Sequence, residues 1–511
     1  MPEYLAPGVY VEEIERGPRP IEGVSTSTAA LLGEAERGPI WPTLVTSYAE
    51  YEHRFGGAFA DGRYMPDAVN GFFENGGRRV YICRIGGNGA TAARLDLGGL
   101  LIEAIGPGEW GNRIRVRLSA VTGPAGAEPT PTRFRLQLAY WREDAPGGIY
   151  PDPFDQPAAT PKAALIEEYD NLLLDQPDSP NDVVRMVGSG SVLVRISRVD
   201  DTALDPVEMG DLTPLASGVD GARQTVSDYG GDPAGNGLRS GLAALDLDDF
   251  REVALIAAPA AAPDVADAIR THCERNRYRF AVIDCDANVG DPASLDPRKD
   301  WDSGYAAFHY PWIYTSDLQS GGRRLVPPSG HVLGVYARVD TERGVWKAPA
   351  NEILRGVLDL PYQVDERTQE VLNPRGVNII RAFTGRGIRL WGARTLSSDA
   401  QWKYVSVRRH FIFLERSIEE GTRWVVFEPN GERLWEQVKD TIRQFLRTQW
   451  RDGALMGVKE EQAFFVKCDR STMTQNDIDN GRLICEIGVA PLRPAEFVIL
   501  RIFQNTSGVD R

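Results

Sequence analysis

Two aspartates stand at the point of the chain where an α/β protein would bind a ligand. Asp284 and Asp286 close the run FAVIDCD, which is typical of a strand, and α/β folds bind ligands at the carboxyl ends of their strands. An enzyme would also need a recognisable nucleophile–base pair or a phosphate-binding motif. The sequence contains no G-x-x-x-x-G-K-[ST], H-E-x-x-H or G-x-S-x-G signature. An α/β enzyme with a cleft near Asp284 and Asp286 is therefore kept only as the alternative hypothesis.

Two further segments could bind a phosphate or a cation. The glycine-rich run YGGDPAGNGLRSG at 229–241 lacks the preceding strand and the following lysine of a phosphate loop, so it is interpreted as a flexible joint between domains. Asp246, Asp248 and Asp249 are close enough in sequence to suggest calcium, but the glycine and the terminal glutamate of an EF-hand loop are absent. A solvated turn is the simpler interpretation of these three aspartates.

Histidines, cysteines and one basic tripeptide complete the search for chemistry. The five histidines are scattered without metal-ligand spacing, and the five cysteines, an odd number, contain no C-x-x-C pair. The cysteines in strand-like runs are expected to be small buried residues: Cys83, Cys285 and Cys485. The tripeptide Arg408-Arg409-His410 could clamp a phosphate, but it is placed on a strand beside FIFLE, where interface or surface ion pairs are expected. The sequence thus predicts no catalytic residue, no metal and no cofactor.

Predicted strands and helices alternate in two stretches of the chain, at 23–96 and 225–345. In the first stretch, the strands TAALLGEA and RVYICRI flank helices over SYAEYEHRFG and PDAVNGFFENGG. In the second, the predicted strands are VALIAAP, FAVIDCD and HVLGVYARVD, with a helix over PDVADAIRTHCERN. This rhythm is typical of a parallel α/β sheet.

The rest of the chain follows two other patterns. Between the α/β stretches, residues 97–224 alternate apolar and polar side chains, as in IRVRLSAV, TRFRLQLAYW and SVLVRISRV, so we predict a mainly β domain inserted into the α/β domain. From 346 to 511 we predict an α+β assembly domain with a closing strand. Its clearest element is the helix ERLWEQVKDTIRQFLRTQW, whose apolar face carries Leu434, Val438, Ile442, Phe445, Leu446 and Trp450. The predicted fold class is thus α/β and α+β multidomain, preceded by a strand arm at 1–22.

The charge of the chain is unevenly distributed. The 511 residues carry 57 lysines and arginines against 72 aspartates and glutamates, a net charge of −15. Residues 151–250 hold 6 basic and 19 acidic side chains, 6 − 19 = −13, whereas residues 351–511 hold 24 and 22, 24 − 22 = +2. Such a chain lacks the general cationic face that nucleic acid requires and is disfavoured on an anionic membrane. Its start, MPEYLAPGVYVEE, has no signal-peptide pattern, so synthesis in the cytoplasm is expected.

Both ends of the chain carry segments typical of strands. The closing segment is almost entirely apolar, and a shorter apolar segment near the start is cut off by Gly17, Pro18 and Pro20. The residues concerned are Phe497, Val498, Ile499, Leu500, Ile502 and Phe503, and Val9, Tyr10 and Val11. An open apolar strand edge recruits other chains, so one interpretation is pairing of these strands between neighbouring subunits. An ordinary sheet within one chain is the other.

A basic stripe runs along the predicted helix at 433–451. Its cations recur every four residues: Lys439, Arg443, Arg447 and Arg451. With Arg433 added and with Glu436 and Asp440 opposing, the helix carries 5 − 2 = +3. A solvated helix face is the usual explanation of such a pattern, and a docking surface for an acidic partner is the alternative.

Seven segments spread over nearly the whole chain form a recognisable set. They are LAPGVYVEE at 5–13, GPGEWGNRIRV at 106–116, PPSGHVLGVYARVDTERGVWKAPANE at 327–352, GVNIIRAFTGRGIRLWGARTLSSD at 376–399, WKYVSVRRHFIFLERSI at 402–418, WVVFEPN at 424–430 and IGVAPLRPAEFVILRIFQ at 487–504. Together they resemble the tail sheath proteins of contractile phages and related contractile injection systems. Residues 115–224 match this family least.

The resemblance implies a structural subunit rather than an enzyme. Copies of the chain would stack into a helical sleeve around an inner tube, and contraction of the sleeve would drive the tube through a target envelope. The resemblance also implies that the terminal strands join sheets of neighbouring copies and that the stripe Lys439, Arg443, Arg447 and Arg451 faces the tube. The implied partners are further copies of the chain, the tube protein, and baseplate and terminal cap proteins. The particle would be a phage tail or an injection particle, in the cytoplasm or released on lysis.

Overall fold

The structure, a computed structural model, describes residues 20–59, 62–97, 100–120, 133–174, 177–199, 210, 212–231 and 239–499. The chain divides into two compact units. The central unit comprises Ser25–Arg408, and the terminal unit combines Met1–Val24 with Arg409–Arg511. Each unit is described by itself below.

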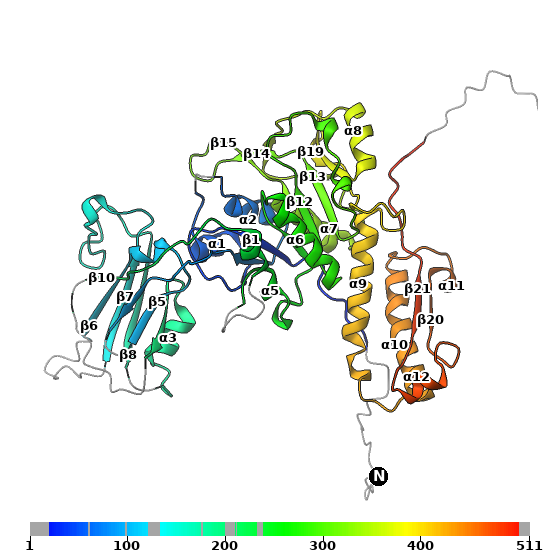
Figure 1. Cartoon of the computed structure of the whole chain (residues 1–511), viewed down its shortest axis with the longest axis horizontal. Helices are drawn as coiled ribbons and strands as arrows, with labels where there is room; N and C mark the ends of the chain where they lie inside the picture. Colours follow the sequence, from blue (N-terminus) through cyan, green and yellow to red (C-terminus); the bar gives the residue numbers. More distant parts are fainter. Residues whose placement is uncertain are drawn as a thin grey trace, which may run out of the picture. The chain divides into compact units, whose positions relative to one another are not determined.

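The central unit is built on a large sheet, drawn in Figure 1. Among the described residues the sheet has nine strands. In order across the sheet they are β16 (Glu352–Ile353), β19 (Gly387–Leu390), β18 (Val377–Phe383), β13 (Ala306–Tyr310), β12 (Phe280–Asp284), β11 (Leu255–Ala257), β1 (Ala29–Gly33), β3 (Val80–Arg84) and β2 (Thr43–Val45). The strands from β18 to β3 run parallel, and antiparallel strands close both edges. The predicted parallel sheet is therefore confirmed, with TAALLGEA as β1, RVYICRI as β3, VALIAAP as β11 and FAVIDCD as β12.

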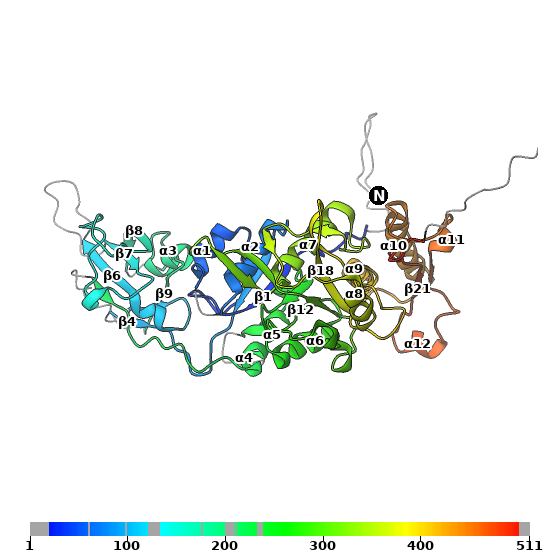
Figure 2. The same ribbon diagram turned by 90° about the horizontal axis from the view of Figure 1, so that it is seen from above.

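Helices cover both faces of this sheet. Figure 2 shows α5 and α6 on one side of β1 and β12, and α2 and α7 on the other. Ile256 of β11 and Ile283 of β12 share a buried apolar cluster with Val265 and Ile269 of α6. Apart from α3 and the start of α9, which are described below, the helices of the central unit in the described ranges are α1 (Tyr48–Phe55), α2 (Met65–Glu74), α4 (Val226–Gly230), α5 (Gly241–Leu245), α6 (Pro263–Asn276), α7 (Ser329–Arg343) and α8 (Glu366–Leu372). The predicted helices over SYAEYEHRFG, PDAVNGFFENGG and PDVADAIRTHCERN are confirmed as α1, α2 and α6.

The prediction of a strand over HVLGVYARVD was wrong, because this segment forms α7. Every residue from Ser329 to Val339 in α7 is buried, so the helix has no polar face to reveal its period. Two glycines of α7 lie directly against the backbone of α2. A Cβ on Gly330 would come 2.2 Å from the Ala68 carbonyl oxygen, and one on Gly334 would come 2.4 Å from that of Phe72. Close helix packing thus overrides the strand propensity of the valines.

Smaller sheets lie in the chain between β3 and α4. In the described ranges, β10 (Thr213–Pro214), β6 (Ile114–Ala120), β7 (Arg133–Tyr140) and β8 (Leu165–Leu173) form one antiparallel sheet, and β4 (Arg94–Asp96), β5 (Leu100–Ala104) and β9 (Val194–Arg198) form another. Residues of both sheets and of α3 (Val183–Gly190) share one apolar core. The strands expected in IRVRLSAV, TRFRLQLAYW and SVLVRISRV are thus present, whereas the assignment of 97–224 as an inserted domain stays a prediction. A further sheet joins β15 (Arg323–Val326), β14 (Ile313–Ser316) and β17 (Val357–Asp359).

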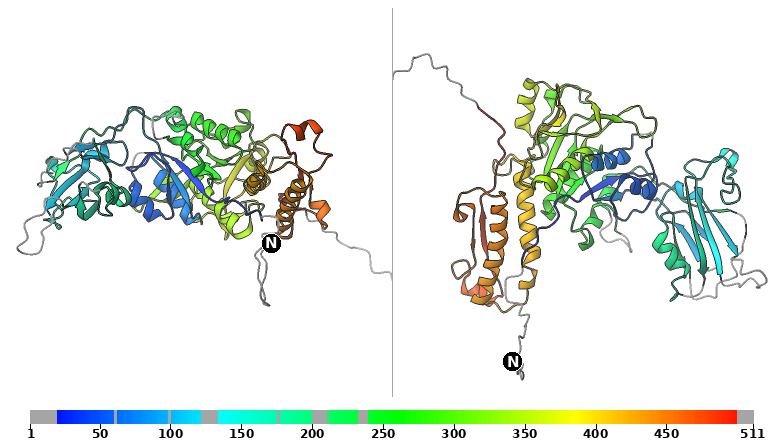
Figure 3. Two further views of the ribbon diagram at one scale, coloured as in Figure 1. Left: turned by 90° about the horizontal axis from the view of Figure 1, so that it is seen from below. Right: turned by 180° about the vertical axis from the view of Figure 1, so that it is seen from behind.

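The terminal unit consists mainly of long helices and one small sheet. Its elements are the greater part of α9 (Val405–Gly421), α10 (Glu432–Arg451), α11 (Glu460–Ala463), β20 (Phe464–Lys467), α12 (Gln475–Asp479) and β21 (Glu486–Val489). Figure 3 shows α10 in orange beside the two strands. The placement of Arg408-Arg409-His410 on a strand was wrong, because these residues lie on α9 and are buried. Burial of this helix outweighs the strand propensity of its valines and phenylalanines.

The fold is thus a mixed α/β multidomain arrangement with several separate sheets. None of the helices in the described ranges combines the length and the apolar character of a bilayer-spanning segment.

Candidate assembly surface

Helix α10 presents one apolar face to the terminal unit and one charged face to its surroundings. Its buried face includes Leu434, Trp435, Val438, Ile442, Phe445 and Leu446. These side chains pack with Leu414 of α9, with Leu455 after the end of α10, and with Phe464 of β20. The predicted helix and apolar face are confirmed; Trp450 is half-buried and donates its indole N–H to the Gly457 carbonyl oxygen at 2.9 Å. The four cations of the basic stripe lie outside the buried face of a rigidly packed helix.

Three of these four cations already have partners within the chain. Lys439 Nζ lies 2.6 Å from Glu436 Oε1, one turn earlier. Arg443 Nε donates to Glu460 Oε1 at 2.7 Å, and Arg447 donates to both oxygens of the same carboxylate, at 2.7 and 3.1 Å. Arg451 is exposed and forms no ion pair within the described ranges. With Glu460 counted, the stripe and its neighbours carry 5 − 3 = +2 rather than +3.

Glu460 links α10 to the small sheet. It is the first residue of α11, which leads directly into β20, so the two arginines hold the start of β20 against α10. The hydrogen bonds from Arg447, and then those from Arg443, lower the pKa of Glu460 to about 2. Sequence reasoning missed this residue because its partners are 13 and 17 positions away.

Replacing Glu460 by Gln is expected to loosen β20. Because its folded pKa lies below the ordinary value, the carboxylate contributes stability above about pH 4 that is lost as the pH falls towards 2. The arginine side chains are 49% and 36% exposed, so solvent screening reduces the contribution to about 1 kcal/mol. Hydrogen exchange at Phe464–Lys467 should accelerate about fivefold at neutral pH, and the difference from the wild type should vanish near pH 2. Glu461→Gln, at the exposed neighbouring position, is the matched control; equal effects would contradict the clamp.

Among the described residues, the small sheet of the terminal unit has two strands and no strand beyond either of them. Strands β20 and β21 pair antiparallel, from Phe464 opposite Val489 to Lys467 opposite Glu486. Within the described part of the chain no third strand joins them. Just past the end of β21, the Met456 N–H donates to the Ala490 carbonyl oxygen at 2.8 Å. Along β20 and β21 themselves, the outer sides have no strand partner in the described ranges, which is the condition for adding a strand from another chain.

The predicted terminal strands fall largely outside the described residues. Val9, Tyr10, Val11, Leu500, Ile502 and Phe503 belong to this group. Phe497, Val498 and Ile499 are described and are 71%, 77% and 78% exposed. They form no strand within the described part of the chain. Among the described residues of their own unit, nothing buries these apolar side chains.

The terminal unit also exposes other large apolar side chains. They are Val426, Phe427, Met456, Val458 and Phe465. Phe427 is fully exposed, and its φ of 71° is uncommon for a residue other than glycine. Sequence reasoning did not identify these positions, because Val426, Phe427, Met456 and Val458 are isolated apolar residues in loops and Phe465 is a single outward residue of β20. Exposed apolar side chains mark an interaction surface where they gather into one patch.

Both side-chain oxygens of Asp284 accept hydrogen bonds from the backbone. Its Oδ1 accepts a hydrogen bond from the Ser329 N–H at 2.7 Å, at the start of α7, and its Oδ2 accepts one from the Ala260 N–H at 3.2 Å. Burial raises the pKa of Asp284 to about 7. Asp286 is exposed. The carboxylate thus joins the loop after β11 to α7, which leaves the enzyme hypothesis without a free acidic pair.

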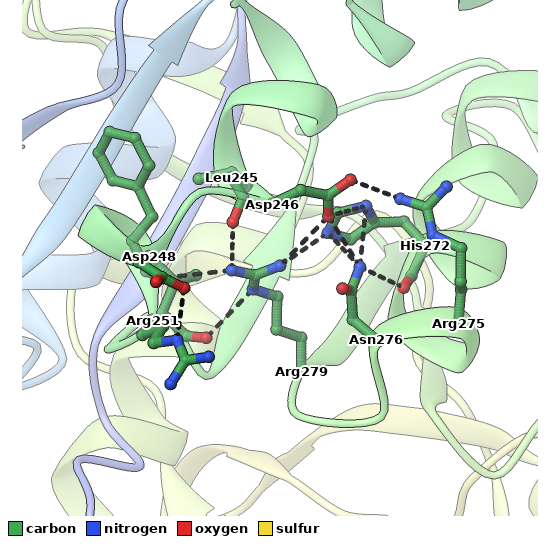
Figure 4. A network of polar contacts seen from close by, with 10 residues as sticks. Leu245, Asp246, Asp248, Arg251, His272, Arg275, Asn276 and Arg279 are labelled. Carbon is green, nitrogen blue, oxygen red and sulfur yellow. Dashed lines mark hydrogen bonds and ion pairs between the residues drawn. The ribbon is translucent and has the colours of Figure 1, made fainter. Parts of the chain in front are cut away.

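Two aspartates of the acidic turn, Asp246 and Asp248, are paired with arginines. Figure 4 shows Asp246 bonded to Arg275 at 2.6 Å and to Asn276 at 3.0 Å, and Asp248 bonded to Arg251 at 2.8 Å. Buried Arg279 donates to the carbonyl oxygens of Leu245, Phe250 and Val253. Burial, with Arg279 nearby, lowers the pKa of His272 to about 4. This network fastens the turn to α6 and β12.

The remaining candidates offer no chemistry either. No group of three metal-binding side chains occurs within the described ranges. Arg408 stacks on Trp402, with its guanidinium carbon 3.3 Å from the ring centroid. The middle of the glycine-rich run, at 232–238, lies outside the described residues. The features that stand out are those of an assembling subunit: open strand edges, exposed apolar side chains and a charged helix face.

Comparison with known protein families also indicates an assembling subunit. The family model of the phage tail sheath protein central domain matches residues 234–396, and that of the phage tail sheath C-terminal domain matches residues 397–505. The chain belongs to the phage tail sheath family. A tail sheath protein of Burkholderia phage BcepMu is 25% identical over 480 residues, covering 88% of each chain. A prophage major tail sheath protein of Pseudomonas aeruginosa is 28% identical over 269 residues, covering 51% of this chain and 68% of that one.

Solved sheath structures share the fold. The sheath of the extracellular contractile injection system PVC, in its contracted state, matches with a TM-score of 0.59 at 23% identity, covering 99% of both chains. The contracted helical sheath of the anti-feeding prophage matches with a TM-score of 0.58 at 23% identity, covering 98% of this chain and 100% of that one. Family and fold are those of structural tail sheath proteins and not of enzymes, so the alternative at Asp284 and Asp286 is not supported.

Proposed function

We propose that the chain is a structural subunit of a contractile sheath. Copies polymerise helically around an inner tube, and the sheath contracts to drive the tube through a target envelope. The observation that carries this proposal is the two-stranded sheet β20–β21, whose outer edges are open among the described residues, in a chain of the tail sheath family. A sheath of this kind belongs to a phage tail or to an injection particle.

Neighbouring copies are joined by exchanged strands. Val9–Val11 of one copy and Phe497–Phe503 of another each add to an open edge of β20–β21. The exposure of Phe497, Val498 and Ile499 supports this role, since backbone hydrogen bonds to an edge give adhesion and alternate side chains give register. Because every copy both donates and accepts strands, the contact is heterologous and propagates into a helix.

The inner tube meets the charged face of α10. Arg451 is the stripe residue best suited to bind an acidic partner, since Lys439, Arg443 and Arg447 already bond to Glu436 and Glu460. The other three cations contribute to the field of the surface while keeping α10 and β20 together. Baseplate and terminal cap proteins contact the ends of the sleeve.

The mainly β region at 97–224 faces outward from the sleeve. The support for this placement is charge: residues 151–250 carry a net −13, which favours solubility and repels neighbouring sleeves. Residues 351–511, at net +2, lie inside, where subunits and tube must touch. Contraction is then a change between two packings of the same subunits, which needs no catalytic residue.

Electron microscopy of the chain co-expressed with its tube protein tests the proposal. The wild type is expected to form hollow helical sleeves, most of them filled. Arg451→Glu should still form sleeves but should lower tube co-sedimentation about tenfold, because it reverses the charge of the stripe residue that forms no ion pair within the described ranges. Arg185→Glu, an exposed position on α3, is the control. Soluble monomers in every buffer would overturn the proposed function, and unchanged co-sedimentation of Arg451→Glu would overturn the tube contact alone.

A further inference from the structure

Two cysteines far apart in sequence meet at one end of the small sheet. Cys468 follows β20 directly, and Cys485 directly precedes β21. The last pair of the ladder is Lys467 opposite Glu486, so the next pair in the same register is Cys468 opposite Cys485. The Cys485 thiol forms a hydrogen bond with Cys468 and so lowers the pKa of Cys468. The register places the two side chains opposite each other on the same face of the sheet.

The position of this pair in the ladder suits a covalent bond between the strands. The Ala490 N–H donates to the Ala463 carbonyl oxygen at 2.8 Å, which makes 463 and 490 a hydrogen-bonded pair. Hydrogen-bonded and non-hydrogen-bonded pairs alternate along an antiparallel ladder, so Cys468 and Cys485 fall on a non-hydrogen-bonded pair. The Cα atoms of such pairs are about 4.5 Å apart, which lies within the range that a disulfide spans.

The chain beyond the pair already holds the two cysteines in place. The Thr472 hydroxyl accepts from the Asp469 N–H at 3.3 Å and donates to the Ile484 carbonyl oxygen at 2.8 Å. It thus connects the residue after Cys468 to the residue before Cys485. The short helix α12 within the loop is capped by Thr474, whose hydroxyl accepts from the Asp477 N–H at 3.2 Å. The loop is therefore organised before any covalent bond forms.

We propose that Cys468 and Cys485 are a redox modification site, which thiol–disulfide exchange with a low-molecular-weight disulfide converts into a cross-strand disulfide. Cys485 is the partly exposed member and Cys468 is buried, so a small disulfide can reach Cys485. The Cys485 thiolate therefore attacks first, even though the hydrogen bond to Cys468 raises the pKa of Cys485. One small thiolate leaves and takes up a proton. The Cys468 thiolate then attacks the Cys485 sulfur and expels the second small thiolate, which also takes up a proton. Two protein thiols and one small disulfide thus become one protein disulfide and two small thiols.

The disulfide would fasten the sheet whose edges are proposed to receive exchanged strands. The cross-link closes the loop 468–485 and restricts separation of β20 from β21. A reducing compartment keeps the pair open, and an oxidising environment outside a cell closes it. The modification is a property of the single chain and does not depend on the proposed function.

Oxidation of the purified full-length chain with oxidised glutathione, against a dithiothreitol control, tests the proposal. Mass spectrometry of a non-reduced digest should find a Cys468–Cys485 peptide lighter by two hydrogens than its parts, and only after oxidation. Hydrogen exchange in Glu486–Val489 should slow on the order of 100-fold. Recovery of Cys468 as a free thiol, or of both cysteines as separate glutathione adducts, would overturn the proposal.

Single-cysteine variants separate the pair from general thiol reactivity. Cys468→Ala should stop the reaction at a glutathione adduct on Cys485, without slower exchange. Cys485→Ser, at the partly exposed position, should leave Cys468 unmodified. The buried cysteines Cys83, Cys273 and Cys285 serve as internal comparators and should stay unmodified in every sample. Cross-linking of either variant's remaining cysteine to one of these three would also contradict a site built from this pair.

Discussion

Deleting residues 1–20 is expected to abolish sleeve formation while leaving the rest of the chain folded. The deletion removes Val9–Val11, the strand proposed to add to a neighbour's sheet, so each copy loses one of its two strand contacts. The cut is placed before Ile21, because Ile21 packs into the apolar core of the terminal unit, and before Val24, whose N–H donates to Ser417 Oγ at 3.1 Å. Electron microscopy should show no sleeves, and circular dichroism should show an unchanged folded spectrum.

Ile21→Ala is the control for this deletion. It costs about 1 kcal/mol by removing apolar contact in the terminal unit, but it keeps the strand. This variant should therefore be less stable than the deletion variant and should still assemble. Normal sleeves from the deletion variant would show that the arm is dispensable and would refute strand exchange at this end.

The elements that could be predicted from sequence are those whose pattern of apolar and polar residues follows their burial in the fold. Short apolar runs between turn residues form β1, β3, β11 and β12. Helix α10 has one solvent-exposed face and one buried face. Helix α7, from Ser329 to Val339, and the start of α9 have no solvent-exposed face, because other parts of the protein bury them on all sides. Their valines and aromatic residues therefore led to the prediction of strands, because nothing in the local pattern distinguishes a buried helix from a buried strand.

The features of the candidate surface also differ in whether they could be predicted from one segment of the sequence. The stripe on α10 follows from a four-residue spacing, which is visible in one segment. Glu460 and the pair Cys468 and Cys485 act across 13 to 17 residues of chain, and only the folded register brings them together. Glu460 changes the meaning of the stripe, because Arg443 and Arg447 hold the terminal unit together and are no longer free to serve the tube alone.

The contact between α2 and α7 offers the strongest test of the fold itself. Two helices approach closely only where side chains are absent at the crossing, and Gly330 and Gly334 supply two such positions on one face of α7. Both face backbone atoms of α2, at Ala68 and Phe72, and not flexible side-chain ends. A helix backbone cannot move locally without disturbing the sheet on which it packs.

Gly330→Ala is therefore expected to destabilise the central unit by about 3 kcal/mol, because the new methyl group must push α2 and α7 apart. In an open helix the same change stabilises, since alanine loses less backbone entropy than glycine. Gly188→Ala in α3 is the matched control: nothing lies within 4 Å of its Cβ position, and a gain of about 0.5–1 kcal/mol is expected. Urea unfolding of both variants measures the two effects. Opposite signs would show that the approach of α2 to α7 sets the cost, whereas similar small gains would mean that the two helices can separate freely and that close packing does not explain why HVLGVYARVD is a helix.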